Sequence, residues 1–77
     1  MNNNYIAICE LEKKNRTDFK NYLFLHFKIR PTVRLRSISE TRVRAIIICP
    51  GTSPENKAKN KKIIHEVLST FNIISLK

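Results

Sequence analysis

The chain has 77 residues and a mass of 9.0 kDa, which is enough for one small domain and near the lower limit for a core without disulfides, a metal or a partner. Hydrophobic residues make up 42% of it, which argues against a disordered chain. Fifteen Lys and Arg against six Asp and Glu give a net charge of +9. We therefore treat residues 1–77 as a single small basic domain that favours anionic partners.

The first part of the chain predicts a strand followed by a helix. Residues 5–11 are rich in β-branched side chains, which is typical of a short strand, and residues 12–16 are polar, as in a loop. Asn15 or Thr17 can cap the next helix, and Asp18 suits the positive end of its dipole. Five side chains then follow at helical spacing on one face of a helix that we expect to be well buried, with His26 as a packed or edge residue of that face: Phe19, Tyr22, Leu23, His26 and Phe27.

A β-hairpin is predicted in the middle of the chain. Pro31 ends the helical tendency of the residues before it. Residues 32–38 alternate apolar and polar side chains, as a half-buried strand does, and residues 42–49 indicate a more buried one. Residues 39–41 are typical of the turn between them. Pro50 and Gly51 end the second strand of this hairpin.

A second helix and a short terminal strand complete the expected fold. Ser53 is a suitable N-cap and Pro54 is favoured at the first helical position. Asn72 is a suitable end for this helix, and residues 73–76 predict an edge strand. The order β-α-β-β-α-β predicts a ferredoxin-like α+β fold, with two helices on one face of a four-stranded antiparallel sheet.

The register of the hairpin decides which side chains share a face. If Glu40 lies at the centre of an odd-length turn, Leu35 is opposite Ala45 and Arg36 is opposite Arg44. This register gives one apolar face under the helices, whereas an even-length turn would mix the two faces. The uncovered face is then expected to carry Arg34, Arg36, Arg42 and Arg44 together with Ile38, Ile46 and Ile48.

Four arginines on one face indicate an anionic partner. Like charges directly opposite, such as Arg36 and Arg44, cost stability unless something neutralises them. Guanidinium groups suit bidentate phosphate contacts and stacking on bases. Tyr5 is expected beside Ile48, where its ring would join the same surface. The leading hypothesis is a small RNA- or phosphate-binding module, a component of a ribonucleoprotein, with RNA favoured over DNA. The second helix adds a further basic group: Lys57, Lys59, Lys61 and Lys62.

A protein partner is the alternative use of the same face. Ile38, Ile46 and Ile48 would form the centre of the contact, and the arginines would pair with an acidic surface. This hypothesis describes an adaptor, inhibitor or assembly factor that docks an acidic protein or forms a homodimer. A third interpretation is that the arginines only keep the sheet soluble.

The sequence shows no pattern typical of an enzyme or of a metal site. The six carboxylates are scattered, and Gly51 is the single glycine, so no glycine-rich loop exists to hold a nucleotide. His26 and His65 have no Cys, Asp or Glu at ligand spacing. We therefore expect neither catalysis nor a bound metal or cofactor.

The two cysteines indicate a reducing environment. Cys9 and Cys49 are expected about four residues apart along neighbouring strands, roughly 13 Å, which is too far for a disulfide. Both are expected to be small core residues of a protein in the cytoplasm or inside an organelle or plastid. The N-terminus lacks the features of a secretory signal, so secretion is not expected. The longest apolar run, residues 45–49, is too short to span a bilayer, so no membrane partner is expected.

Overall fold

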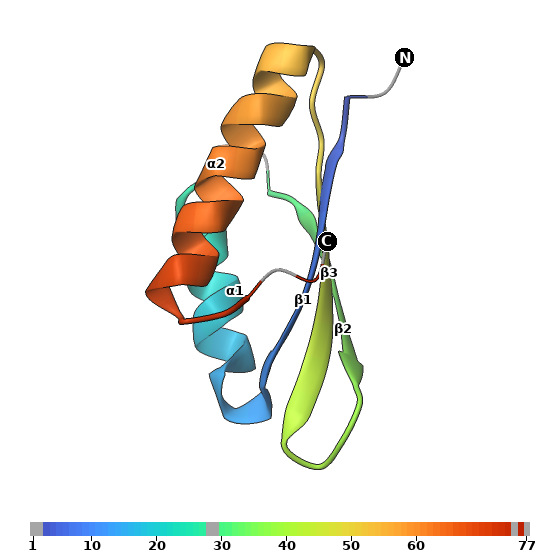
Figure 1. The fold of residues 1–77 in the computed structure, drawn as a ribbon, viewed down its shortest axis with the longest axis vertical. Helices are drawn as coiled ribbons and strands as arrows, with labels where there is room; N and C mark the ends of the chain where they lie inside the picture. The colour runs from blue at the N-terminus through green and yellow to red at the C-terminus, as the bar shows by residue number, and fades with distance from the viewer. Residues whose placement is uncertain (1–2, 28–29, 75, 77) are drawn as a thin grey trace.

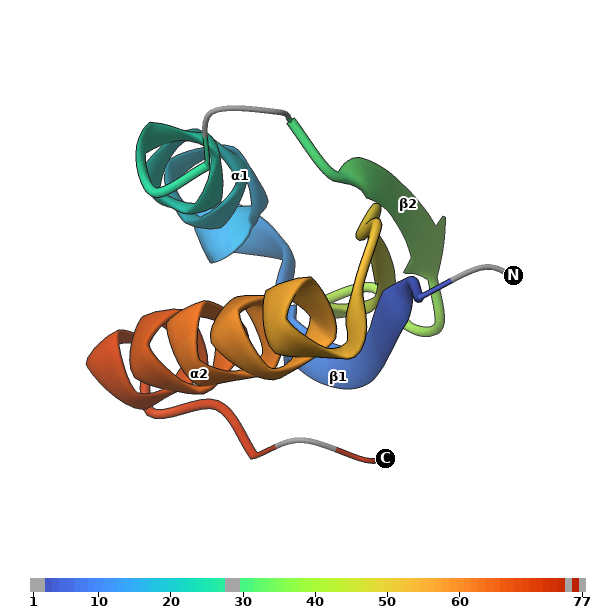
Figure 2. The ribbon, with the colours of Figure 1, turned by 90° about the horizontal axis from the view of Figure 1, so that it is seen from above.

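The computed structural model describes residues 3–27, 30–74 and 76. In chain order these form β1 (Tyr5–Glu12), the 3-10 helix η1 (Lys13–Asn15), α1 (Arg16–Leu25), β2 (Thr32–Ser37), β3 (Arg42–Cys49) and α2 (Pro54–Thr70). The strands make one antiparallel sheet in the order β1-β3-β2, and both helices lie on the same side of it (Figures 1 and 2). The predicted α+β class, with two helices and an antiparallel sheet, is confirmed.

The predicted fourth strand is not formed by the described residues. Ile73, Ile74 and Leu76 have no regular structure, and residue 75 lies outside the described part of the chain. One backbone hydrogen bond, from the Leu76 N–H to the Ile8 carbonyl at 2.8 Å, joins this end to the free edge of β1. So short a terminal segment gains too few ladder hydrogen bonds to offset the entropy of ordering it. The four-stranded, ferredoxin-like order is therefore not confirmed.

Between β1 and α1 the chain is more regular than the predicted loop. Residues 13–15 form η1, and α1 begins at Arg16. The Asn15 side chain makes no capping hydrogen bond, although Asn15 holds the N-cap position. The expected cap is wrong because the preceding 3-10 turn already places Asn15 in a helical conformation, φ −95° and ψ −1°, rather than in the extended one a side-chain cap needs.

The boundaries of α2 follow the predicted signals. The Ser53 hydroxyl accepts a hydrogen bond from the Asn56 N–H at 3.2 Å, and Pro54 opens the helix. At the other end Asn72 adopts a left-handed conformation with φ 55°. The Asn72 N–H donates to the Ser69 carbonyl, and the Ile73 N–H donates to the Leu68 carbonyl. These are the two hydrogen bonds of a Schellman motif.

The core lies between the helices and one face of the sheet. Alternate residues of the two longer strands are buried there: Tyr5, Ala7, Cys9 and Leu11 of β1, and Val43, Ala45, Ile47 and Cys49 of β3. Phe19 and Leu23 of α1 and Ile64 of α2 pack against them. Both cysteines are buried and free, as the sequence predicts. This packing leaves the opposite face of the sheet without a helix.

Candidate interaction surface on the uncovered sheet face

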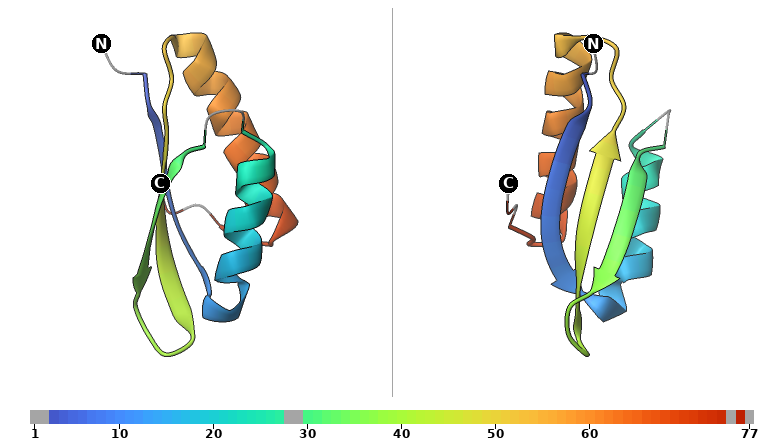
Figure 3. Two further views of the ribbon diagram at one scale, coloured as in Figure 1. Left: turned by 180° about the vertical axis from the view of Figure 1, so that it is seen from behind. Right: turned by 90° about the vertical axis from the view of Figure 1, so that its right-hand side faces the viewer.

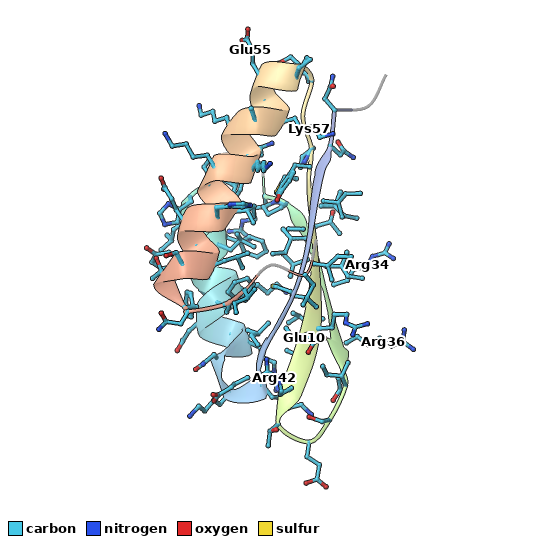
Figure 4. All side chains as sticks on the ribbon, in the orientation of Figure 1. Glu10, Arg34, Arg36, Arg42, Glu55 and Lys57 are labelled. Atoms are coloured by element: carbon cyan, nitrogen blue, oxygen red, sulfur yellow. The ribbon has the colours of Figure 1, made fainter. Side chains whose placement is uncertain are left out.

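The hairpin register agrees with the prediction. Leu35 is opposite Ala45, and Arg36 is opposite Arg44. Side chains of even-numbered strand residues therefore lie on the face of the sheet that is turned away from the helices. The right-hand panel of Figure 3 views the sheet from that face. Arg34 and Arg36 extend away from the helical layer in Figure 4. All four predicted arginines are exposed: Arg34, Arg36, Arg42 and Arg44.

The expected position of Tyr5 is wrong by one residue. Tyr5 pairs with Cys49 rather than with Ile48, so its side chain lies on the helix-facing side of β1. It is only 9% exposed, and its hydroxyl lies 3.5 Å from Nε2 of His65 in α2. Burial, with a smaller contribution from Cys49, raises the pKa of Tyr5. Tyr5 therefore offers no ring to a base on the uncovered face.

The same one-residue difference brings two carboxylates onto the uncovered face. Glu10 is opposite Arg44, and its Oε2 lies 3.0 Å from Arg44 Nη2. Glu12 is opposite Arg42 and its Oε2 lies 3.2 Å from Lys14 Nζ. The repulsion expected between Arg36 and Arg44 is thus reduced by Glu10 within the chain itself. The pair of Arg36 and Arg44 was the strongest indication of an external phosphate, and the structure shows that Glu10 already neutralises one member of it.

Beside these charges lies a group that we call the isoleucine patch: Ile6, Ile8, Ile46 and Ile48. Ile6 is opposite Ile48 and Ile8 is opposite Ile46, so the four form two cross-strand pairs. Ile6 is 41% exposed and the other three are partly exposed. Sequence reasoning found Ile46 and Ile48 but missed Ile6 and Ile8, because it placed β1 one residue out of register.

Ile38 does not belong to this patch. It follows the last residue of β2, and its N–H donates to the Arg42 carbonyl at 3.1 Å, so it lies at the hairpin end of the sheet. Its side chain is 41% exposed. The structure therefore separates Ile38 from the other two isoleucines proposed as a contact centre.

Three arginines on the charged half of the face form no ion pair with a carboxylate in the described part of the chain: Arg34, Arg36 and Arg42. Arg42 is opposite Glu12 in the sheet, whereas Arg34 and Arg36 have no carboxylate opposite them. Both belong to β2, the outer strand, and Arg34 is opposite Ile46 at the border of the isoleucine patch. These two guanidinium groups are the ones positioned to meet an external anion.

The lysines of α2 are not part of this surface. Lys57, Lys59, Lys61 and Lys62 are all exposed on the helix. At about 100° per residue, Lys57 and Lys61 share one flank of α2 whereas Lys59 and Lys62 lie on another. The helix itself covers the opposite face of the sheet from the arginines (Figure 1). The structure therefore does not join the two predicted basic groups.

Comparison with protein-family models, curated proteins and solved structures gives no match. Across residues 3–27, 30–74 and 76, no three His, Cys, Asp or Glu side chains come together as a metal site would require. Neither described helix has the length and apolar content needed to cross a membrane. Burial raises the pKa of both Cys9 and Cys49 to about 11, which leaves their thiols protonated at neutral pH.

Proposed function

We propose that this protein is a protein-binding module that docks an acidic partner on its uncovered sheet face. The observation that supports this most directly is the isoleucine patch, an apolar area on a face that no helix covers. Apolar groups surrounded by polar ones are typical of the centre and rim of a protein interface. Arg34 and Arg36, at the border of the patch, supply a rim of positive charge.

The charge of the chain favours an acidic protein over a second copy. In a homodimer, two chains that each carry a net charge of +9 would be in contact. Such repulsion opposes association, whereas an acidic surface would be attracted at long range and held in register. An adaptor, inhibitor or assembly factor acts in this way. Its role would be non-enzymatic and would belong to a reducing compartment, such as the cytoplasm or the interior of an organelle or plastid.

RNA or phosphate binding is the second candidate. It is supported by the net charge and by the two arginines of β2 that lack an internal counterion. Against it, the described strands place no aromatic ring on the uncovered face, and Glu10 occupies Arg44. Single-strand binders usually combine positive charge with stacking side chains. The charge alone therefore supports this candidate less well than the isoleucine patch supports a protein partner.

A complete ferredoxin-like sheet is part of this proposal. A strand laid along the free edge of β1, where the Leu76 N–H already meets the Ile8 carbonyl, would be the fourth strand. Either the C-terminal residues or a segment of the partner would supply it. In both cases the uncovered face and its isoleucine patch stay accessible.

The decisive experiment compares two variants that each add one glutamate. Ile46 lies in the isoleucine patch, whereas Ala58 is exposed on α2, on the other side of the sheet, and serves as the control for the added charge. A partner is captured from lysate with and without nuclease, identified, purified and titrated by calorimetry. We expect Ile46→Glu to weaken binding at least about tenfold and Ala58→Glu to leave it unchanged. Equal effects of the two variants would refute docking on this face.

The same preparations test the competing functions. If nuclease removes the captured material, a labelled single-stranded RNA oligonucleotide becomes the probe. Four engaged phosphates would make log K fall against log salt with a slope of about −3. Light scattering of the purified chain measures self-association. If the chain forms a dimer and Ile46→Glu dissociates it, the partner of the uncovered face is a second copy of this chain rather than an acidic protein.

A further inference from the structure

A basic groove lies between α1 and β2, outside the surface proposed above. Its volume is about 730 Å³. Phe24, Leu25 and Leu35 give it apolar walls, and Leu25 is 83% exposed. Arg16, Lys20 and Arg30 also line it, and none of its described lining residues is acidic. The groove therefore combines apolar contact area with three positive charges.

Two of these cations converge on one ring. Lys20 Nζ lies 5.9 Å from the Phe24 ring centroid, and Arg30 Cζ lies 5.2 Å from it. Lys20 comes from α1 and Arg30 precedes β2, so two separate segments of the chain each place a positive charge beside the Phe24 ring. Like charges that share one groove favour an anion beside them. The ring is at the same time covered by cations, which makes it a poor platform for a base.

The free edge of β2 borders the same groove. The Ile38 N–H donates to the Arg42 carbonyl, so even-numbered residues of β2 direct their backbone groups toward β3. The backbone groups of Val33, Leu35 and Ser37 therefore point away from the sheet. No described residue pairs with this edge of β2. A row of unpaired N–H and C=O groups is a template for an added strand.

We propose that the groove and the free β2 edge bind an extended acidic segment of a partner protein by strand addition. Side chains opposite Val33 and Leu35 would enter the groove, because paired residues share a face of the sheet. Side chains opposite Arg34 and Arg36 would lie on the uncovered face beside these unpaired guanidinium groups. The recognised segment therefore alternates apolar and acidic residues, and further carboxylates at its ends meet Arg16, Lys20 and Arg30.

A peptide fits these features better than a nucleic acid does. RNA has no backbone groups that match the row at Val33, Leu35 and Ser37, and the Phe24 ring is occupied by Lys20 and Arg30. The site uses the outer edge of β2 and the side of α1 rather than the isoleucine patch, and shares only Arg34 and Arg36 with the surface proposed above. It goes beyond the proposed function, and either can fail without the other.

The first test uses a labelled peptide of about ten alternating valines and glutamates, with two further glutamates at each end to meet Arg16, Lys20 and Arg30, and measures its binding by fluorescence anisotropy. A peptide of the same composition with its valines and glutamates in two blocks is the control for charge alone. Two further peptides carry N-methyl groups on every valine or on every glutamate. In an antiparallel pair the valine N–H groups face β2, and in a parallel pair the glutamate N–H groups do.

Strand addition predicts that one N-methylated peptide binds at least about tenfold more weakly while the other binds within about twofold of the parent. Whether methylation of the valines or of the glutamates weakens binding also shows whether the added strand is antiparallel or parallel to β2. The block peptide should bind at least about tenfold more weakly than the alternating one. Equal affinities of both N-methylated peptides and the parent would overturn the proposal and indicate binding by charge alone.

The second test locates the site on the protein. Lys20→Glu changes the groove, and Lys59→Glu makes the same charge change on the exposed surface of α2. We expect Lys20→Glu to weaken binding of the alternating peptide at least about tenfold more than Lys59→Glu does. Circular dichroism confirms that each variant is folded. If a single-stranded RNA oligonucleotide displaces the peptide and shows the same sensitivity to Lys20→Glu, the groove is a nucleic-acid site and the proposal is wrong.

Discussion

Cys9 and Cys49 are buried on the helix-facing side of the sheet, and this burial lowers the reactivity of their thiols. Burial raises the pKa of each thiol from its ordinary 9.0 to about 11, and the nearby Glu10 charge adds to the effect at Cys9. The thiolate is the reactive form of cysteine, so both side chains are poor nucleophiles and poor metal ligands near pH 7. Their role is to fill the small spaces between the strands and the helices.

The raised thiol pKa values predict a loss of stability in alkaline solution. In the unfolded chain the thiols ionise near pH 9, whereas the folded chain holds these protons until about pH 11. The contribution of the thiols to the free energy of unfolding should therefore be constant below pH 9 and fall between pH 9 and 11, by up to about 1.4 kcal/mol per pH unit for each thiol. Urea denaturation at several pH values measures this fall.

A variant with Cys9→Ala and Cys49→Ala is the control for this prediction. Its stability should fall less steeply over the same range, because the two thiols no longer contribute, although Tyr5, whose pKa is also raised, still adds to the alkaline loss. If the variant and the parent lose stability in parallel, the thiols are not the cause.

Gly51 is required for space rather than for an unusual backbone angle. Its φ is not positive, but a Cβ at this position would lie 2.6 Å from the Asn3 carbonyl oxygen. Because the opposing atom is backbone, relief needs a shift of the chain. Gly51→Ala should lower the free energy of unfolding by about 1–3 kcal/mol in chemical denaturation. Lys59→Ala, on the exposed side of α2, should change it by less than about 0.5 kcal/mol. A Gly51→Ala protein as stable as the parent would contradict the close approach.

At the scale of elements, the hairpin could be predicted and the pairing of β1 could not. A short turn around Glu40 joins β2 to β3, and only one register gives Leu35 and Ala45 a common apolar face. No turn joins β1 to β3, because η1, α1 and β2 lie between them in the chain. Residues 5–9 are apolar on both faces of β1, so alternation alone leaves two registers open.

The polar end of β1 carries the information that decides its register. Glu10 and Glu12 belong on the uncovered side, opposite Arg44 and Arg42, because the other side of the strand is sealed by helices. With this choice Tyr5 enters the core, and Ile6 and Ile8 join Ile46 and Ile48. The position of the candidate surface was predictable from the hairpin, but its apolar half and its internal carboxylates were not.

The Glu10–Arg44 pair should contribute little to stability. Its atoms are 3.0 Å apart, but the side chains are 26% and 47% exposed, so solvent screens the attraction. Glu10→Gln should lower the free energy of unfolding by less than about 1 kcal/mol, and Glu12→Gln, whose carboxylate is more exposed, by less still. A double-mutant cycle with Arg44→Gln isolates the interaction in urea denaturation. A coupling well above 1 kcal/mol would mean that the pair holds β1 in register.

At the scale of the whole molecule, positive charge is present on every side. Arginines lie on the uncovered face, lysines on α2, and Arg16, Lys20 and Arg30 around the groove. The molecule measures 38 × 21 × 18 Å, so its width is only about two Debye lengths at physiological ionic strength. An approaching molecule therefore responds to the net charge of the whole chain as well as to the face it meets. The surface features decide where a partner docks, and the net charge decides which partners approach.

Salt should therefore act in opposite directions on the two kinds of association. Self-association through the isoleucine patch is opposed by the +9 charge of each copy, so screening should strengthen it. Docking of an acidic protein is assisted by the same charge, so screening should weaken it. Light scattering of the chain and calorimetry with its acidic partner, at about 0.02 M and about 0.5 M salt, measure the two trends. A dimer that forms in low salt and dissociates in high salt would contradict this, and would mean that Glu10 and Glu12 of one copy pair with the arginines of another.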